Sequence, residues 1–251
     1  MGLFNRCEAY LRSDSVAIVS LRGTVNQLPS WLENFYSGMV PANGSMKLND
    51  STTYNYHLAN NPNALVHVGS LIGTGFLSRQ YEPYLEAPLN RGIRSVIVTG
   101  FSQGGALTFL NTSHVYYKYS SSYPGLQVKA YAGAAPKPGN LYYAYDFDHI
   151  TANGWGYRVV NTADWVPETP VSVQTVNDFV DINPITDAKA TINKQKGATR
   201  IALKHIYNRM DKASYKAMKT LTKHLGRDVG KQEKRFCRSC KHRHLPTAAC
   251  T

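Results

Sequence analysis

The stretch that decides the fold reads Ser95-Val-Ile-Val-Thr-Gly-Phe-Ser-Gln-Gly-Gly-Ala-Leu107. Its first half is apolar and β-branched, as a buried parallel strand requires, and its second half predicts the beginning of a helix. Between the two halves lies Gly100-Phe-Ser102-Gln-Gly104, a G-x-S-x-G motif in the strand–turn–helix context that gives it meaning. So sharp a turn forces its central serine into a strained conformation with an exposed hydroxyl. We therefore interpret Ser102 as a candidate nucleophile.

The motif alone is a weak signal, because G-x-S-x-G also arises by chance and a glycine-rich turn can serve packing only. The apolar strand before it and the small residues after it favour the nucleophile. A serine hydroxyl is a poor nucleophile at neutral pH, so the interpretation needs a histidine base and a carboxylate that orients it.

Strands and helices alternate along the rest of the chain, which at 251 residues suits one large domain. The patterns predict strands over 15–24, 64–69, 128–136 and 157–164, helices over 28–39, 71–85, 105–119 and 211–225, and irregular chain over 43–64 and 171–200. Such alternation predicts an α/β fold with a mostly parallel sheet. The domain is expected to span residues 1–226.

The net charge of +12 is unevenly distributed. Residues 1–182 hold 11 Lys and Arg against 12 Asp and Glu, a net charge of −1, whereas residues 183–251 hold 17 against 4, a net charge of +13. A basic segment of this kind can bind a membrane surface or nucleic acid. The positive charge is explained equally well by a solvated helix face followed by a disordered basic tail over residues 227–251. We favour this interpretation and therefore expect no nucleic-acid partner.

Three of the four cysteines lie in that tail. The run Cys237-Arg-Ser-Cys240-Lys-His242-Arg-His244 has the donor atoms of a zinc site, but its spacing is too short for a zinc finger. We therefore expect neither a metal nor an organic cofactor. No apolar run approaches the roughly 20 residues of a membrane span, and the first residues do not form a signal-peptide pattern.

Asp164 is the favoured acid because it ends a predicted strand, where sites of open α/β sheets are built. It also precedes the candidate histidines, as the order Ser, acid, His requires in such sheets. Asp146 and Asp148 are rivals in a tyrosine-rich segment without a predicted strand to fix them. Asp164 could instead cap the turn that follows it.

Four histidines follow Asp164 in the sequence: His205, His224, His242 and His244. The last two lie in the basic tail, and His224 stands near the end of a predicted helix, where it suits the helix dipole. His205 precedes that helix, so the folded body could hold it over the sheet edge. It is the favoured base, with an exposed surface histidine as the alternative.

Several motifs together resemble the class 3 (fungal-type) lipases over residues 10 to 225. They are Leu21-Arg-Gly-Thr24, Val66-His-Val-Gly69, Gly100-Phe-Ser-Gln-Gly-Gly105, Gly133-Ala-Ala-Pro136 with Gly139-Asn140, and Tyr157-Arg-Val-Val-Asn-Thr-Ala-Asp-Trp-Val-Pro167. The resemblance implies an α/β-hydrolase fold, with a mostly parallel central sheet and helices on both faces. It also implies hydrolysis of carboxylic esters, commonly acylglycerols, and it suggests a secreted protein.

The same resemblance implies roles for particular residues. Ser102 would be the nucleophile, Asp164 the triad acid and His205 the nearest counterpart of the triad histidine. The backbone N–H groups of Thr24 and Gln103 would form the oxyanion hole, although Gln103 stands where leucine is usual.

The segment of Trp31, Leu32 and Phe35 would correspond to a lid that buries apolar side chains when shut and opens at a lipid–water interface. From periodicity alone, the same residues predict an amphipathic helix that packs on the core, with Ser30 and Glu33 on its outer face.

A lipid or another ester is therefore the expected substrate, and the sequence does not indicate an oligomeric state. Two alternatives stay open. One is a catalytically silent hydrolase fold that binds anionic membranes or polyanions through its basic C-terminal third. The other is a phospholipase, amidase or acyltransferase on the same fold.

Overall fold

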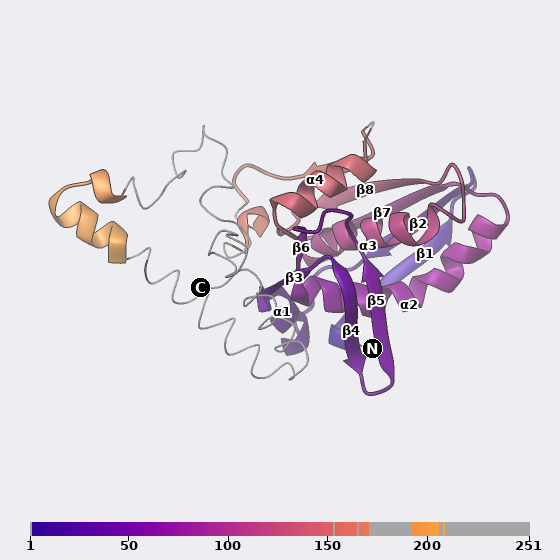
Figure 1. Cartoon of the computed structure of the whole chain (residues 1–251), viewed down its shortest axis with the longest axis horizontal. Helices are drawn as coiled ribbons and strands as arrows, with labels where there is room; N and C mark the ends of the chain where they lie inside the picture. Colours follow the sequence, from indigo (N-terminus) through magenta and orange to yellow (C-terminus); the bar gives the residue numbers. More distant parts are fainter. Residues whose placement is uncertain (1, 153, 165, 171–191, 206–207, 209–251) are drawn as a thin grey trace.

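A five-stranded sheet of order β1-β2-β7-β8-β9 forms the centre of the fold (Figure 1). The computed structural model describes residues 2–152, 154–164, 166–170, 192–205 and 208. The strands are β1 (Cys7–Leu11), β2 (Val16–Leu21), β7 (Ser95–Phe101), β8 (Gln127–Gly133) and β9 (Gly156–Val159). Strand β1 is antiparallel to β2, and the other neighbours are parallel. The predicted α/β class with a mostly parallel sheet is confirmed.

Two long helices, α2 (Val68–Asn90) and α3 (Gln103–Tyr119), pack side by side against one face of this sheet (Figure 1). Val96 and Val98 of β7 and Ala130 of β8 point into this layer and are buried. Helix α4 (Leu141–Ile150) lies beside α3, where the rings of Phe109 and Phe147 meet edge to face.

The opposite face carries the alternate residues of the same strands, among them Lys129 and Tyr131 of β8 and Tyr157 of β9. The two tyrosine rings stack at 5.0 Å, and Lys129 Nζ lies 5.0 Å from the centre of the Tyr157 ring. The described helices in substantial contact with the sheet, α2 and α3, lie on its other face, so a second helical layer, which the resemblance implies, is not found among the described residues.

A β-hairpin of β4 (Asn43–Asn49) and β5 (Thr52–His57) stands where irregular chain is expected, so that prediction is wrong. Met46, Tyr54 and Tyr56 alternate toward the interior and are buried, which gives the hairpin its apolar face. The asparagines that suggested a loop lie on its exposed positions and at its ends.

Other elements differ from the predictions at their ends. The predicted first strand is preceded by β1, and α2 continues to Asn90 with Pro83 and Pro88 inside it. Two short strands, β3 (Met39–Pro41) and β6 (Leu65–His67), pair antiparallel. Short 3-10 helices are present at Gly2–Phe4 and Val166–Glu168. Residues 192–194 and 197–205 are helical, so part of the segment 171–200 that was expected to be irregular forms helix. The predicted helix over 211–225 and the tail over 227–251 lie outside the described residues.

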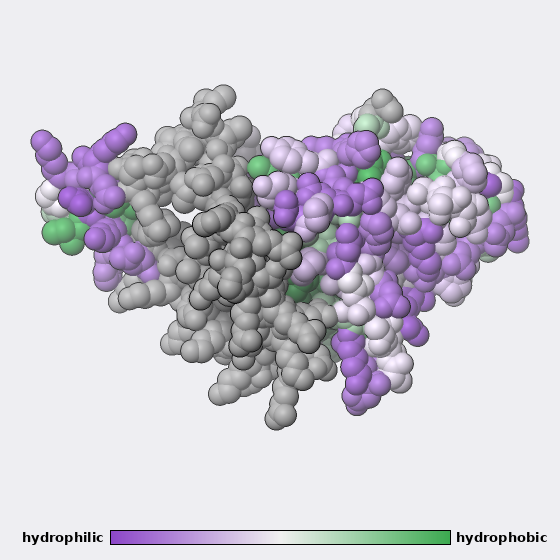
Figure 2. All heavy atoms as spheres, in the orientation of Figure 1, coloured by the Kyte–Doolittle hydropathy of each residue, from purple (hydrophilic) through white to green (hydrophobic). Residues whose placement is uncertain are grey.

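The described surface in the view of Figure 2 is predominantly hydrophilic over α2 and the tip of the β4–β5 hairpin. None of the helices in the described part of the chain is both long and apolar enough to span a bilayer.

Candidate active site

Ser102 occupies the turn between β7 and α3 in a backbone conformation that few L-residues adopt, with φ +58° and ψ −123°. Its N–H donates to the carbonyl oxygen of Gly133 at 2.9 Å, and its own carbonyl accepts from the N–H of Ala106 at 3.1 Å. The turn is therefore held from the neighbouring strand on one side and from the new helix on the other. Ser102 itself is half-buried.

The glycines of the motif are required by close packing of backbone on backbone. A Cβ on Gly100 would lie 2.3 Å from the carbonyl oxygen of Gly104, and a Cβ on Gly104 would lie 2.3 Å from that of Leu21. Neither backbone carbonyl can move by that much without a shift of the helix or strand that carries it. The strand–turn–helix arrangement predicted for this motif is present.

The turn after β2 lies directly against the nucleophile turn. A Cβ on Gly23 would lie 2.8 Å from the carbonyl oxygen of Phe101 and 3.8 Å from Ser102 Cβ. Thr24 follows Gly23, and Gln103 opens α3, so these two residues flank Ser102. Their backbone N–H groups remain the predicted oxyanion donors.

Helix α1 (Leu28–Phe35) has the reverse of the expected orientation. Leu28, Trp31 and Phe35 are exposed, by 70%, 45% and 57%, whereas Ser30 and Glu33 are buried. Of the other apolar residues predicted for the inner face, Leu32 packs partly against the core, and Tyr36 and Met39 are buried just beyond the end of the helix. The expected orientation is therefore wrong for Leu28, Trp31 and Phe35, and for Ser30 and Glu33, which were expected to face outward.

Polar contacts and close backbone packing explain that orientation. Asn5 Nδ2 donates to Glu33 Oε2 at 2.8 Å. A Cβ on Gly69 would lie 2.0 Å from the Glu33 carbonyl oxygen, and one on Gly73 would lie 2.3 Å from Glu33 Oε1, so α1 rests on the glycine face of α2. Burial raises the pKa of Glu33 to about 8, with the Asn5 bond opposing the rise.

Asp164 follows β9 at the carboxyl edge of the sheet, the edge on which β7 delivers Ser102. Its Oδ1 accepts the N–H of Val166 at 3.0 Å, so the carboxylate does cap the following turn. Among the described residues, no hydrogen bond joins Asp164 to Ser102 or to a histidine. Its rivals Asp146 and Asp148 lie on α4, and Asp146 is occupied by the N–H of Asn60 and the hydroxyl of Tyr117.

His205 ends the helical residues 197–205 and is exposed, as are residues 193–204. The structure describes no contact of His205 with Ser102 or Asp164. The other described histidines have partners or positions elsewhere: His57 bonds Asn60, His67 caps α2, and His149 is exposed at the end of α4. In the part of the chain that the structure describes, Thr24, Ser102 and Gln103 lie together and no histidine joins them. His224, His242 and His244 lie outside the described residues.

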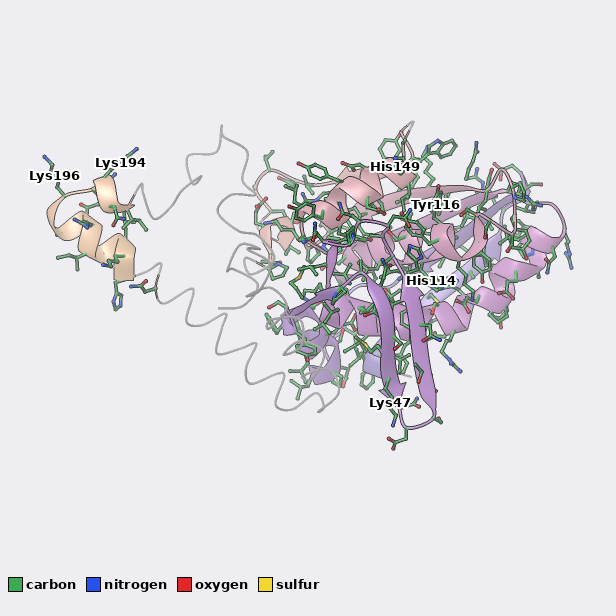
Figure 3. All side chains as sticks on the ribbon, in the orientation of Figure 1. Lys47, His114, Tyr116, His149, Lys194 and Lys196 are labelled. Carbon is green, nitrogen blue, oxygen red and sulfur yellow. The ribbon has the colours of Figure 1, made fainter. Side chains whose placement is uncertain are left out.

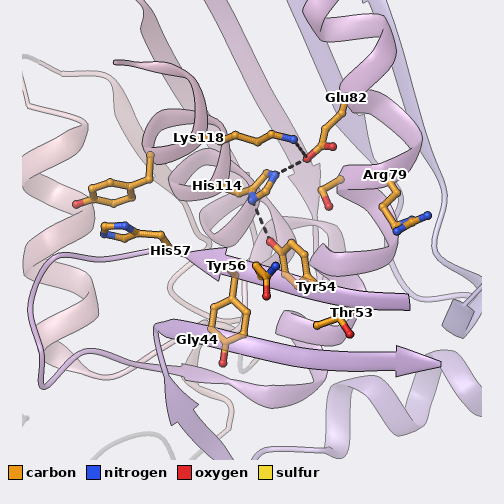
Figure 4. Close-up of a pocket in the computed structure, with 12 residues that line it drawn as sticks. Gly44, Thr53, Tyr54, Tyr56, His57, Arg79, Glu82, His114 and Lys118 are labelled. Atoms are coloured by element: carbon orange, nitrogen blue, oxygen red, sulfur yellow. Dashed lines mark hydrogen bonds and ion pairs between the residues drawn. The ribbon is translucent and has the colours of Figure 1, made fainter. Parts of the chain in front are cut away.

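Two hollows are relevant to the site. One of about 420 Å³ adjoins the nucleophile turn and is lined by Gly23, Phe101, Tyr131 and Val159, among others. The other, of about 510 Å³, lies between the β4–β5 hairpin and helices α2 and α3 (Figure 4). No group of three or more His, Cys, Asp or Glu side chains suited to a metal ion occurs in the described part of the chain.

The second hollow contains a polar network that the sequence did not indicate (Figure 4). Buried His114 contacts the Tyr54 hydroxyl through Nδ1 at 3.0 Å and Glu82 Oε1 through Nε2 at 2.7 Å. Lys118 Nζ lies 2.8 Å from the same Glu82 oxygen. The network ties β5, α2 and α3 together, which indicates a structural role.

The Lipase (class 3) family model matches residues 18–174. Solved structures with a similar fold include the Lip2 lipase of Yarrowia lipolytica (19% identity, 67% of this chain and 58% of that one, TM-score 0.49) and a triacylglyceride lipase of Rhizomucor miehei (20%, 68% and 57%, 0.48). A triacylglycerol lipase of Penicillium expansum is 17% identical, over 67% of this chain and 59% of that one, with a TM-score of 0.47. The chain thus spans less than two thirds of the length of these lipases. No curated protein sequence matches it. Since the family model covers more than half of its residues, the chain belongs to the class 3 lipase family.

Proposed function

We propose that this protein is a serine hydrolase of carboxylic esters, with Ser102 as the nucleophile and lipid esters such as triacylglycerols as substrates. The observation that carries the proposal is the strained backbone of Ser102 in a turn where Gly100 and Gly104 have no room for a side chain. Family membership supports the same chemistry, because a G-x-S-x-G turn with this geometry presents the serine hydroxyl to substrate.

The proposed reaction is acyl transfer to water in two steps. A histidine, for which His205 is our candidate, takes the proton of Ser102 as Oγ attacks the ester carbonyl, and then gives that proton to the departing alcohol. Water, activated by the same imidazole, next cleaves the acyl-enzyme and releases the carboxylic acid. Asp164 would hold the imidazole in the required tautomer and stabilise its positive charge.

The backbone N–H groups of Thr24 and Gln103 would bind the negative oxygen of each tetrahedral intermediate. Loss of one such donor typically costs about 3–4 kcal/mol of transition-state stabilisation. Helix α1 would supply the lipid contact, because Trp31 and Phe35 are exposed and their rings stack at 6.0 Å. An exposed apolar surface on the helix that is hydrogen-bonded to Gln103 suits a lipid–water interface.

The test is labelling with a fluorophosphonate probe, followed by peptide mapping and by hydrolysis of a p-nitrophenyl ester. Wild type should be labelled at Ser102, and Ser102→Ala should lose both labelling and turnover with an unchanged circular dichroism spectrum. Ser113→Ala, which removes a buried serine hydroxyl farther along α3, is the matched control and should retain both. Turnover by Ser102→Ala would overturn the nucleophile assignment.

The histidine needs its own experiment. His205→Ala should abolish turnover, whereas His149→Ala, an exposed histidine of α4, should leave it unchanged. If His224→Ala abolishes turnover and His205→Ala does not, the base is His224 and the present assignment is wrong.

A second function is favoured by the charge distribution, namely binding of anionic membranes by the basic C-terminal third. Lys194 and Lys196 are exposed in its described part (Figure 3). Cosedimentation with vesicles that contain phosphatidylserine, with and without residues 227–251, would test it. Vesicle binding without any esterase activity would favour this function over catalysis.

A further inference from the structure

We propose that Gln103 and Ser30 form a latch that sets the spacing of the oxyanion hole and makes α1 part of the catalytic apparatus. Both would be positioning residues, because their side chains act on the backbone of the turns beside them. This inference rests on the proposed function.

Both the nitrogen and the oxygen of the Gln103 side-chain amide form hydrogen bonds with Ser30. Its Nε2 donates to the carbonyl oxygen of Ser30 at 2.9 Å, and its Oε1 accepts from the Ser30 hydroxyl at 3.1 Å. Gln103 is 3% exposed and Ser30 is 1% exposed, so water does not compete for these bonds. The residue after the nucleophile is therefore fixed to α1 by two buried hydrogen bonds.

Ser30 also reaches the turn that carries the other predicted oxyanion donor. Its Oγ accepts the N–H of Val25, the neighbour of Thr24, at 3.2 Å. A single hydroxyl thus bridges the chain next to Thr24 and the side chain of Gln103. The position of Ser30 therefore sets the distance between the backbone N–H groups of Thr24 and Gln103.

The rest of the inner face of α1 holds Ser30 in place. Asn34 Nδ2 donates to Thr24 Oγ1 at 2.9 Å, and Glu33 lies buried against α2. Rotation of α1 to bury Trp31 and Phe35 would break these contacts and the latch together. A change in the orientation of α1 would therefore also change the geometry of the oxyanion hole.

The coupling predicts a particular kinetic defect. An oxyanion hole acts on the transition state, and small displacements of its donors lower kcat more than they alter substrate binding. Ser30→Ala and Gln103→Met keep the volume nearly constant. The first removes the bonds of the Ser30 hydroxyl to Gln103 and Val25, and the second removes both bonds of the Gln103 amide. Each should lower kcat about tenfold, with KM changed by less than about twofold.

Two further comparisons separate positioning from mere stability. The double variant should lose less than the sum of the two single variants, because the bond between the Ser30 hydroxyl and Gln103 Oε1 is already lost in each. Ser30→Thr keeps the hydroxyl and should restore most of kcat. Inhibition by an alkyl boronic acid, whose adduct with serine places an anionic oxygen in the hole, should weaken in parallel with kcat.

Ser113→Ala is the control, because it also removes a buried serine hydroxyl bond of α3, the 2.9 Å contact with Tyr143. It should lower the melting temperature and leave kcat unchanged. Equal kcat in Ser30→Ala and Ser113→Ala, with wild type labelled at Ser102, would overturn the latch alone. A wild-type protein that is neither labelled nor active would overturn the proposed function, and the latch with it.

Discussion

The carbonyl oxygen of Leu21 lies where a side chain on Gly104 would have to go, 2.3 Å from an ideal Cβ at that position. This contact joins the end of β2 to the first turn of α3. Gly104→Ala should therefore cost about 3 kcal/mol or more of unfolding free energy, because backbone must move on both sides. Denaturant titration would measure the loss.

Gly133→Ala is the control for that change. Its Cβ would be tight only against the Phe101 ring, at 3.0 Å, and that ring is exposed and can shift; the Gly100 carbonyl oxygen would lie at an ordinary contact distance of 3.6 Å. Equal stability of the two variants would contradict the packing that we describe.

Asp164→Asn should lower kcat by about four orders of magnitude, as the loss of a triad carboxylate does. The asparagine oxygen can still accept the N–H of Val166, so the unfolding free energy should change little. Steady-state kinetics and thermal melts together check both statements.

Asp146→Ala should show the opposite pattern. Asp146 bonds Tyr117 and Asn60, so its loss should cost about 1–3 kcal/mol of stability and leave the remaining activity per folded molecule unchanged. An inactive Asp146→Ala protein with normal stability would make Asp146 the acid instead of Asp164.

Glu33 should make stability fall as the pH rises. Burial raises its pKa from 4.5 to about 8, so the folded protein keeps a proton that the unfolded chain has already released in this interval. The contribution of protonated Glu33 to the unfolding free energy is fully present below pH 4.5 and is lost as the pH rises through about 8. Glu33→Gln should flatten the dependence of unfolding free energy on pH between 5 and 9; parallel curves for the two proteins would show that Glu33 does not titrate as described.

Glu82 should make the stability of the fold depend on pH under acidic conditions. Burial acts to raise its pKa, but the bonds from His114 and Lys118 outweigh burial, and the pKa is lowered. Its stabilising contribution is therefore present at neutral pH and is lost as the pH falls below about 4.5 through the lowered pKa.

Glu82→Gln should accordingly be less stable than wild type at pH 7, by about 1–3 kcal/mol. The difference should shrink in acid. Glu8→Gln, at an exposed carboxylate that pairs with Arg6, should have little effect at either pH. A difference between Glu82→Gln and wild type that is constant with pH would rule out the charge of Glu82 as its cause.

The sequence predicted the parts of the fold that local pattern determines. The Ser95–Leu107 stretch specified strand, turn and helix, because β-branched residues, glycines and small residues each have one suitable place there. The β4–β5 hairpin was missed, since its asparagines suggested loop while Tyr54 and Tyr56 alternate on its inner side. Helix α4 was missed because its tyrosines and aspartates lack a clear apolar stripe.

The site was only partly predictable for a related reason. Ser102 has a local signal and Asp164 a position at the end of a predicted strand, whereas Thr24 was named only through a resemblance over much of the chain. The predicted inner face of α1 is largely its outer face in the structure. Periodicity identifies an apolar stripe on a helix, but it does not show whether that stripe is buried. Ser30 and Glu33 repeat at helical spacing as well, but only partners distant in sequence, Gln103 and Asn5, make that stripe the inner one.

The glycines beneath α1 also determine which residues of this helix can change during evolution. With only hydrogen atoms at positions 69 and 73, the helix is seated by its backbone and by Glu33, and its outward side chains take no part in that seating. Mutation at Leu28, Trp31 or Phe35 can therefore change the lipid contact that we propose for α1 without repacking the molecule. These three positions can vary during evolution while the scaffold beneath them stays the same.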